Sequence, residues 1–193
     1  MRRNYLIVGG TSGIGAKLTE ILARENNIYV VSRNKPDQPI GNVTYLESDV
    51  TSSAVHFDAL PETLDGMAYC PGSINLKPFR SLKNEDFERD LKINLLGAIQ
   101  CLQAAYTRLK RGDQAGVVMF STVAVQKGMH FHSRTAAAKG AVEGLVRSLA
   151  SEWAPAVRVN AVAPSLTDTP LASKLLSSDQ RSQSAAERHP LKR

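Results

Sequence analysis

A glycine-rich segment at the start of the chain constrains the fold more than any other feature. Val8–Gly15 reads VGGTSGIG and lies between an apolar run and the helical apolar spacing of Ala16–Arg24. Gly9 can supply a tight turn, Gly13 lets the backbone approach an anion, and Gly15 lets helix and strand pack closely. The free N–H groups and the positive dipole end of the helix suit a pyrophosphate. A tight turn of the same composition without a ligand is the alternative.

Short apolar runs alternate with helical patterns along the rest of the chain. Helical spacing is strong over Glu85–Lys110 and Arg134–Trp153 and weaker over Ser52–Leu60. Continuous apolar runs are typical of fully buried parallel strands. The sequence therefore predicts an α/β fold with a doubly wound parallel sheet in three layers, a Rossmann fold. The predicted strands are Asn4–Gly9, Ile28–Ser32, Val43–Glu47, Gly66–Cys70, Val117–Ser121 and Val157–Val162.

Three segments depart from this alternation. Asn34–Asn42 contains two prolines and a glycine and is too short for a crossover helix, so we expect a loop crossover there. Leu171–Leu176 predicts a short amphipathic helix that closes over a bound ligand, and the polar tail Ser177–Arg193 is the one candidate for a mobile segment. No repeat or linker divides the 193 residues, which predicts a single domain over residues 1–193.

Charge and cysteine content exclude several classes of function. The net charge is +6, but the basic residues form no compact face interleaved with aromatic residues, so nucleic acid is not an expected partner. Cys70 and Cys101 have no partner at metal-ligand spacing, so we expect no metal site and no disulfide framework. No apolar run reaches the roughly 20 residues of a membrane span. The N-terminus lacks a signal-peptide core, and the cytoplasm is the expected location.

The residues after the second predicted strand indicate which nucleotide the glycine loop binds. An acidic residue at this position usually holds a ribose 2′-hydroxyl, but the chain has Ser32-Arg33-Asn34-Lys35 there. A guanidinium and an ammonium group favour a 2′-phosphate, which predicts NADP(H) in preference to NAD(H). A solvated basic turn is the alternative interpretation of Arg33 and Lys35.

With these features the chain resembles the short-chain dehydrogenase/reductase family from Asn4 onward. The family's glycine motif is T-G-x-x-x-G-x-G, and Val8 replaces its threonine. Asp49-Val50 resembles the family's adenine-contacting pair. Tyr69–Gly72 aligns with its Asn-Asn-Ala-Gly segment and keeps only the glycine. Asn94 matches the asparagine of its N-x-x-G motif, which the resemblance implies holds a water molecule in a proton relay.

The segment Arg158–Pro170 resembles the family's sixth strand and the loop after it, with Ser165 in place of a glycine. By position, Thr167 and Thr169 contact the nicotinamide carboxamide and the phosphates. The resemblance implies a nucleotide site made of Gly9, Thr11, Ser12, Gly13, Ile14, Gly15, Ser32, Arg33, Asp49, Val50, Cys70, Gly72, Asn94, Lys139, Pro164, Thr167 and Thr169.

The resemblance fails at one position of the implied catalytic centre. Lys139 matches the family's lysine, but Thr135 stands four residues before it, where the family has its tyrosine. Thr122, with Ser121 beside it, stands where the family has a serine. A phenol beside an ammonium group can exchange a proton near neutral pH, and a threonine hydroxyl cannot. The nearby candidates to replace the phenol are Tyr69, His130 and His132, although two histidines here are more typical of an exposed loop that enters the helix.

Three functions remain open. The first is an NADP(H)-dependent oxidoreductase that acts on a small carbonyl or alcohol, with Asn94, Thr122, Thr135 and Lys139 at its centre and the proton supplied by water, a histidine or the substrate. The second is a nucleotide-binding sensor or partner subunit without turnover. The third is a regulator that binds only other proteins and has no affinity for a nucleotide.

The resemblance also bears on assembly. Family members are usually longer and end with a further strand and helix, so we expect a C-terminally short domain that lacks the last strand and has an unpaired edge beside Val157–Val162. The resemblance implies a homo-oligomer, a dimer or tetramer, formed through the helices at residues 85–110 and 134–153. Small residues expected on their outer faces are Ala98, Ala104, Ala141, Gly144 and Ser148.

Overall fold

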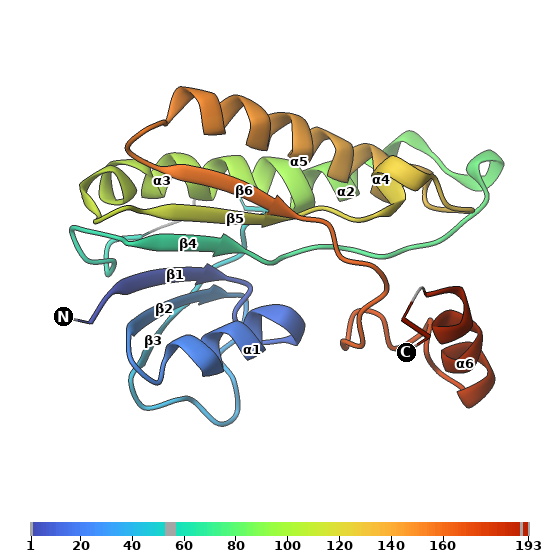
Figure 1. Ribbon diagram of the computed structural model, residues 1–193, viewed down its shortest axis with the longest axis horizontal. Coiled ribbons are helices and arrows are strands. Elements are labelled where there is room, and N and C mark those ends of the chain that lie inside the picture. The colour runs from blue at the N-terminus through green and yellow to red at the C-terminus, as the bar shows by residue number, and fades with distance from the viewer. Residues whose placement is uncertain (1, 53–56, 190, 193) are drawn as a thin grey trace.

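One sheet of six parallel strands organises the computed structural model, which describes residues 2–52, 57–189 and 191–192 (Figure 1). The strand order is β3-β2-β1-β4-β5-β6, and every neighbouring pair is parallel. Because the order reverses between β1 and β4, the connections leave these two strands in opposite directions and open a crevice at their carboxyl ends. The strands are β1 (Asn4–Val8), β2 (Asn27–Ser32), β3 (Val43–Glu47), β4 (Gly66–Tyr69), β5 (Gly116–Phe120) and β6 (Arg158–Val162).

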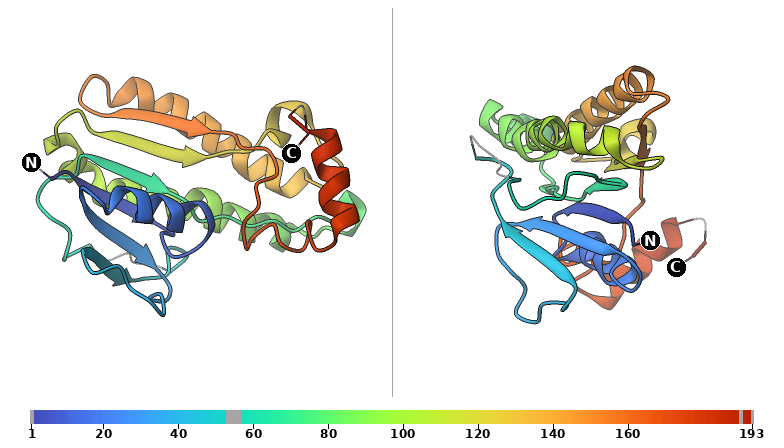
Figure 2. Two further views of the ribbon diagram at one scale, coloured as in Figure 1. Left: turned by 60° about the horizontal axis from the view of Figure 1, so that its bottom comes forward. Right: turned by 90° about the vertical axis from the view of Figure 1, so that its left-hand side faces the viewer.

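Helices cover both faces of the sheet, which confirms the predicted three-layer, doubly wound architecture. The right-hand view of Figure 2 places α1 on one face and α3 and α5 on the other. The helices are α1 (Gly13–Leu22), α2 (Asn84–Leu91), α3 (Gly97–Arg111), α4 (Ala124–Lys127), α5 (Ser133–Glu152) and α6 (Asp179–Arg188). A 3₁₀ turn, η1, spans Phe79–Ser81, and a π-helical turn, η2, spans Lys92–Leu96. Residues 33–42 cross between β2 and β3 without a helix, as expected.

The structure corrects three expectations about helices. The pattern over 85–110 is not one α-helix, because η2 widens the backbone between α2 and α3. Residues 171–176 form successive turns instead of a helix, and the polar segment after them contains α6, whose first turn is capped by the Ser178 hydroxyl. Of the weak helix at 52–60, residues 53–56 lie outside the described residues, and 57–60 form turns.

Apolar packing on the two faces of the sheet is unequal. The larger cluster joins β-strands to α3 and α5, whereas the smaller one lies under α1 and centres on Ile7, Ile28 and Val30. Ala98, expected on an outer helix face, is fully buried in the larger cluster, because this side of α3 packs against the sheet. Cys101 is buried, and Cys70 is half-buried.

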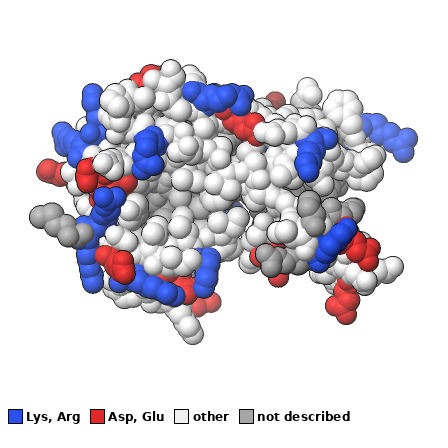
Figure 3. Space-filling model, viewed as in Figure 1, with Lys and Arg blue, Asp and Glu red and all other residues white. Residues whose placement is uncertain are grey.

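Charged side chains of both signs lie around the edge of the face in Figure 3. On the face shown in Figure 3, Lys and Arg side chains lie among Asp and Glu around a largely uncharged centre. Strand β6 forms an edge of the sheet, and Val162 at its end is 48% exposed. Within the described ranges, every helix is too short or too polar to traverse a bilayer.

Candidate active site

The turn between β1 and α1 has the conformation that its glycines predict. Gly9 adopts φ +76°, a left-handed conformation that a residue with a Cβ rarely adopts, and its N–H donates to the Val31 carbonyl. A Cβ at Gly15 would lie 2.2 Å from the Gly9 carbonyl oxygen. The first turn of α1 therefore packs directly on the loop, and only a glycine allows this approach.

The beginning of α1 is open to an anion. Ser12 precedes the helix in extended conformation, its side chain makes no capping hydrogen bond, and no acidic residue lies in the first turn. The backbone N–H groups there have no intrahelical acceptor, and the helix dipole gives them positive potential. A negatively charged ligand is stabilised at such a position.

A pocket of about 360 Å³ extends from this turn along the carboxyl ends of the strands. It includes all but four of the expected nucleotide-binding residues; the exceptions are Asn94, Lys139, Pro164 and Thr167. Sequence reasoning missed Val8, Val31, Ser48, Thr51, Pro71, Ile93, Pro170 and Leu171, which flank the expected positions. The expected residues on the pocket wall are Gly9, Thr11, Ser12, Gly13, Ile14, Gly15, Ser32, Arg33, Asp49, Val50, Cys70, Gly72 and Thr169.

One end of the pocket is polar and basic. Arg33 is exposed at its rim, and the Ser32 hydroxyl donates to the Asn34 carbonyl at 2.7 Å. Asp49 accepts hydrogen bonds from the Thr51 backbone N–H and hydroxyl, both at 2.8 Å, and these bonds lower the pKa of its carboxyl group. Arg33 and Lys92 lower this pKa further through their charge. A carboxylate at this position is therefore ionised and its orientation is fixed.

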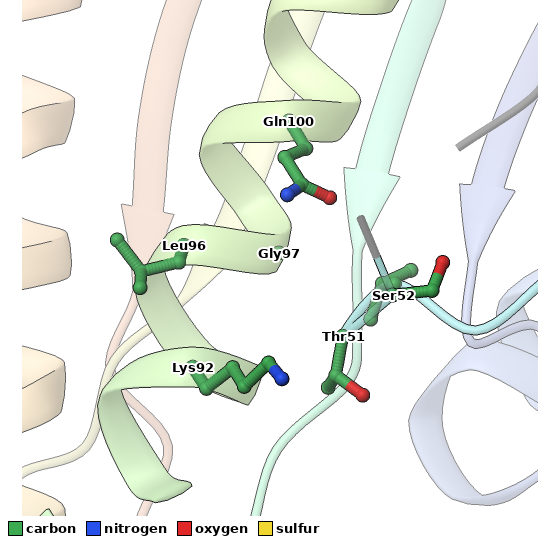
Figure 4. Close-up of a pocket in the computed structure, with 7 residues that line it drawn as sticks. Thr51, Ser52, Lys92, Leu96, Gly97 and Gln100 are labelled. Carbon is green, nitrogen blue, oxygen red and sulfur yellow. The ribbon is translucent and has the colours of Figure 1, made fainter. Parts of the chain in front are cut away.

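A smaller cavity of about 200 Å³ lies beyond this end and shares Val50 and Thr51 with the pocket. In Figure 4, Lys92 extends from the helix toward the segment that carries Thr51, and Gln100 lies further along the same helix, beyond the turn that carries Leu96 and Gly97. The remaining lining residues are Ser52, Leu96 and Gly97. The polar end of the larger pocket therefore continues as a shallow hollow along the start of α3.

At the other end of the pocket, Asn94 and Lys139 converge above Gly72. A Cβ built on Gly72 would lie 3.3 Å from Asn94 Oδ1 and 3.7 Å from Lys139 Nζ. Asn94 is completely buried within the π-helical turn, and its Nδ2 donates to the Asp90 carbonyl at 2.8 Å. Asn94 Oδ1 has no hydrogen-bond partner among the described residues. A buried acceptor of this kind indicates room for a water molecule or a ligand group.

Lys139 has an unusual electrostatic environment. Its side chain is only 9% exposed, and burial lowers its pKa to about 8. Cys70 and Asp90 act in the opposite direction and partly offset the effect of burial. None of the ion pairs among the described residues involves Lys139. The ammonium group is therefore available both to bind hydroxyl groups and to release a proton near neutral pH.

Thr135 lies one helical turn before Lys139, on the same face of α5. Its side chain is 6% exposed, and Oγ1 has no hydrogen-bond partner among the described residues. Thr122 lies between β5 and α4, and its Oγ1 accepts from the Ala124 N–H at 3.3 Å. Ser121 is buried and donates to Glu143 Oε1 at 2.6 Å, so of these two neighbours Thr122 has the hydroxyl proton free to donate.

The structure removes Tyr69 from the candidates for a proton donor. The ring is buried, and its hydroxyl donates to the Ile93 carbonyl at 2.6 Å. Burial also raises the pKa of this phenol above its usual value. His130 is exposed on the loop before α5, and His132 Nδ1 lies 2.7 Å from the His130 carbonyl oxygen. The histidines are thus loop residues, as their alternative interpretation expects.

The segment after β6 returns to the glycine loop. The Thr169 side chain lies beside Gly13, where a built Cβ would be 3.4 Å from Thr169 Cβ. The Pro164 carbonyl accepts from the Val123 N–H, which ties the segment to the residues after β5. Thr167 is exposed, and its hydroxyl donates to the Ser165 carbonyl. The segment therefore connects the residues after β5 with the start of α1, and Figure 1 shows it descending from β6 toward α1.

These features fit a dinucleotide and give no indication of a metal. The open helix start and the glycine loop lie on the pocket wall, and the unpartnered Asn94 Oδ1 lies beside Gly72 of the same wall. The described residues contain no group of three or more His, Cys, Asp or Glu side chains placed to hold a metal ion.

Comparison with known proteins agrees with this arrangement. Residues 9–193 match the family model described as enoyl-(acyl carrier protein) reductase. A tropinone reductase homologue of Arabidopsis thaliana is 32% identical over 209 residues, which cover 98% of this chain and 79% of that protein.

Two solved structures have the same fold. A short-chain type dehydrogenase/reductase from Mycobacterium ulcerans superposes with a TM-score of 0.86 at 28% identity, covering 99% of this chain and 77% of that one. ElxO with NADP bound superposes with a TM-score of 0.83 at 23% identity, and the match covers 100% of this chain and 86% of that one. The glycine turn, the parallel sheet, the buried lysine and these matches lead to one conclusion: the chain belongs to the short-chain dehydrogenase/reductase family of oxidoreductases.

Proposed function

We propose that the chain is an NADP(H)-dependent oxidoreductase that interconverts a small carbonyl compound and its alcohol. The observation that carries the proposal is the convergence of Asn94 and Lys139 above Gly72, at one end of a pocket that begins at an open helix start. A dinucleotide along this wall has its pyrophosphate at α1 and its reactive ring near the buried lysine.

The choice of NADP(H) over NAD(H) rests on the polar end of the pocket. Residues 33–35, directly after β2, include no carboxylate, and Arg33 lies exposed at the rim with Lys35 two residues further on. A guanidinium group recognises a phosphate through paired hydrogen bonds, whereas a ribose hydroxyl needs an acceptor there. The fold neighbour ElxO has NADP bound in its structure.

Several side chains of this chain would have separate roles in the reaction. The bound nicotinamide supplies or accepts a hydride. The Thr122 hydroxyl donates a hydrogen bond to the substrate oxygen and stabilises the charge that develops on it. Asn94 Oδ1 holds a water molecule, and Lys139 binds hydroxyl groups of the cofactor ribose. Gly9, Gly13 and the first turn of α1 hold the phosphates.

We further propose that Lys139 is the source of the proton in the direction of reduction. Thr135 cannot ionise near neutral pH, Tyr69 is held by the Ile93 carbonyl, and the ammonium group of Lys139 has a pKa of about 8. A proton held at this pKa can be released to an alkoxide without a phenol.

Titration of the purified chain with NADPH and with NADH, followed by calorimetry, tests the nucleotide part of the proposal. We expect NADPH to bind more tightly, and Arg33→Ala to weaken NADPH roughly 10-fold while NADH changes little. Arg24→Ala is the matched control, because Arg24 is exposed on the α1 side and pairs with Glu20 away from the pocket. Equal binding of both nucleotides would refute the role of Arg33, and no binding of either would refute the function.

One observation favours a second function, a nucleotide-binding sensor or partner subunit without turnover. The Thr135 hydroxyl is buried without a partner at the position where the family resemblance places the proton donor. This function also requires nucleotide binding and differs only in predicting that no carbonyl compound is reduced.

A further inference from the structure

A buried ion-pair cluster lies beneath the site and joins α5 to α2. Arg134, the residue before Thr135, is 4% exposed. Its guanidinium donates from Nε and Nη2 to the two carboxylate oxygens of Asp90, at 2.6 and 2.7 Å, and from Nη1 to Asp86 at 3.2 Å. The Asp90 side chain is 1% exposed and that of Asp86 8%. The pairing with Asp90 is bidentate, which fixes its geometry as well as its charge.

Asp90 is shared by the segments that carry the site. Its carboxylate also accepts from the Ser73 hydroxyl at 2.6 Å, and Ser73 follows Gly72. Its backbone carbonyl accepts from Asn94 Nδ2 at 2.8 Å, and the same Nδ2 lies 3.2 Å from Ser73 Oγ. Asp90 therefore holds three segments together: the loop after β4, the π-helical turn that contains Asn94, and, through Arg134, the start of α5.

Stability alone does not explain this cluster. Burying an ion pair costs desolvation energy, and a well-packed apolar set of the same volume is often as stable or more stable. Helices α2 and α5 pack against each other, so apolar side chains could fill this interface. What the charged cluster adds is a fixed relative position for the residues on either side of it.

The cluster also sets the charge near Lys139. Two titratable groups act on this side chain from neighbouring elements: Cys70 at the end of β4 and Asp90 on α2. Burial raises the pKa of Cys70 to about 12, so this thiol is neutral at neutral pH. Asp90 thus supplies the negative charge, and Arg134, on the same helix as Lys139, offsets it.

We propose that Arg134 and Asp90 form a positioning pair that holds Lys139 opposite Asn94 across Gly72 and limits the negative charge presented to Lys139. The proposal rests on the proposed function, in which Lys139 binds the ribose and supplies the proton. It assigns a role to two residues that touch neither the pocket nor the substrate.

The titration of Lys139 in the nucleotide-free chain tests this role. Lysines are labelled with ¹³C at Cε, the Lys139 signal is identified by its loss in Lys139→Arg, and its pKa is measured by NMR in each variant. The variants are Arg134→Met, Asp90→Asn, the double variant, and Arg89→Met as the control. Arg89 pairs with Asp86 in the same cluster, but its side chain is 72% exposed.

We expect Arg134→Met and Asp90→Asn to change the pKa of Lys139 in opposite directions. Arg134→Met leaves the Asp90 charge without its partner and raises the pKa of Lys139 by about 1, whereas Asp90→Asn lowers it. The double variant returns it close to the parent value, and Arg89→Met leaves it unchanged. A purely structural role would reduce the melting temperature without this pattern. Shifts of the same sign, or shifts no larger than that of the control, would overturn the proposal.

Arg134→Lys distinguishes the positioning role of Arg134 from the effect of its charge. It also provides a test if Arg134→Met does not fold. It keeps the positive charge but loses the bidentate geometry. We expect the pKa of Lys139 to stay near its parent value while NADPH binds roughly 10-fold more weakly. Unchanged affinity for NADPH in this variant contradicts the positioning role. Because the NMR titration uses no nucleotide, it remains decisive if the parent chain binds no NADPH and the proposed function fails.

Discussion

Thr135 is the side chain on which the chemistry of this protein depends most directly. It stands on the site-facing side of α5, and its buried hydroxyl cannot act as an acid near neutral pH. Thr135→Tyr would introduce a phenol one helical turn from the Lys139 ammonium. We expect carbonyl reduction with NADPH, measured over a panel of small aldehydes and ketones, to rise about 10²-fold or to become detectable.

Thr135→Phe is the control for this change, because it adds the ring without the hydroxyl. It should give no increase. If Thr135→Tyr also leaves the rates unchanged in a folded protein that binds NADPH, this face of α5 does not line the reaction centre.

Lys139 makes the stability of the protein depend on pH in a predictable direction. Burial lowers its pKa to about 8, below the value of about 10.4 in the unfolded chain. Between these values the unfolded chain binds more protons than the folded one, so the contribution of Lys139 to stability rises with pH. We expect the free energy of unfolding of the parent, relative to Lys139→Met, to increase by about 1 kcal/mol between pH 8 and 9.

Denaturant unfolding at the two pH values measures this difference. The comparison with Lys139→Met is necessary because Cys70 and Cys101 also make stability depend on pH. Burial raises the pKa of both thiols to about 12, so their contribution to the stability of the fold falls as the pH rises above the pKa of an unfolded thiol. A difference that is constant with pH would mean that Lys139 titrates as an ordinary exposed lysine.

Among the secondary-structure elements, the β1–α1 turn makes the strictest steric demand. An added methyl group at Gly15 would lie 2.2 Å from the Gly9 carbonyl oxygen, so the backbone must shift. We expect Gly15→Ala to destabilise the fold by roughly 1–3 kcal/mol and to weaken NADPH binding, because the helix start moves away from the phosphate position.

Gly144→Ala on α5 is the matched substitution without this contact. A Cβ there meets no atom within 4 Å, and alanine favours a helix interior over glycine by about 1 kcal/mol. Its melting temperature should rise while that of Gly15→Ala falls. Equal effects of the two substitutions would mean that the close packing at the glycine turn carries no energetic weight.

The whole molecule leaves surfaces that are typical of an assembled protein. On α5 the small residues Gly144 and Ser148 are exposed one turn apart, and β6 has a free edge. Together with the family resemblance, these surfaces favour a homo-oligomer formed through α3 and α5. We expect light scattering of the soluble chain to give a multiple of the monomer mass, and Ser148→Arg to reduce it.

Glu25→Arg, an exposed charge reversal beyond α1 on the opposite face of the sheet, should leave the mass unchanged. A monomer mass for the parent chain would refute the predicted assembly. A multimer that resists Ser148→Arg but dissociates with Glu25→Arg would place the interface on the α1 face.

Local sequence patterns specified the framework of this protein. Runs such as Val43–Glu47 predicted their strand to the residue, and the glycine pattern predicted the left-handed turn at Gly9. These features depend on residues that are close together in the chain: a short β-rich run between turn residues predicts a strand, and a left-handed backbone conformation favours glycine. Because the motifs of the family resemblance follow one another in the expected order, their positions predicted most residues of the pocket wall.

Only the tertiary structure decided which polar side chains meet. Arg134 pairs with Asp90 across 44 positions of sequence, and nothing local distinguishes it from a solvated helix charge. The direction of the Tyr69 hydroxyl and the approach of Asn94 to Lys139 were likewise set by packing between segments. Hydrophobic periodicity predicts whether a residue is buried, but it does not identify the side chains that surround it. The chemistry of a buried polar group depends on those surrounding side chains.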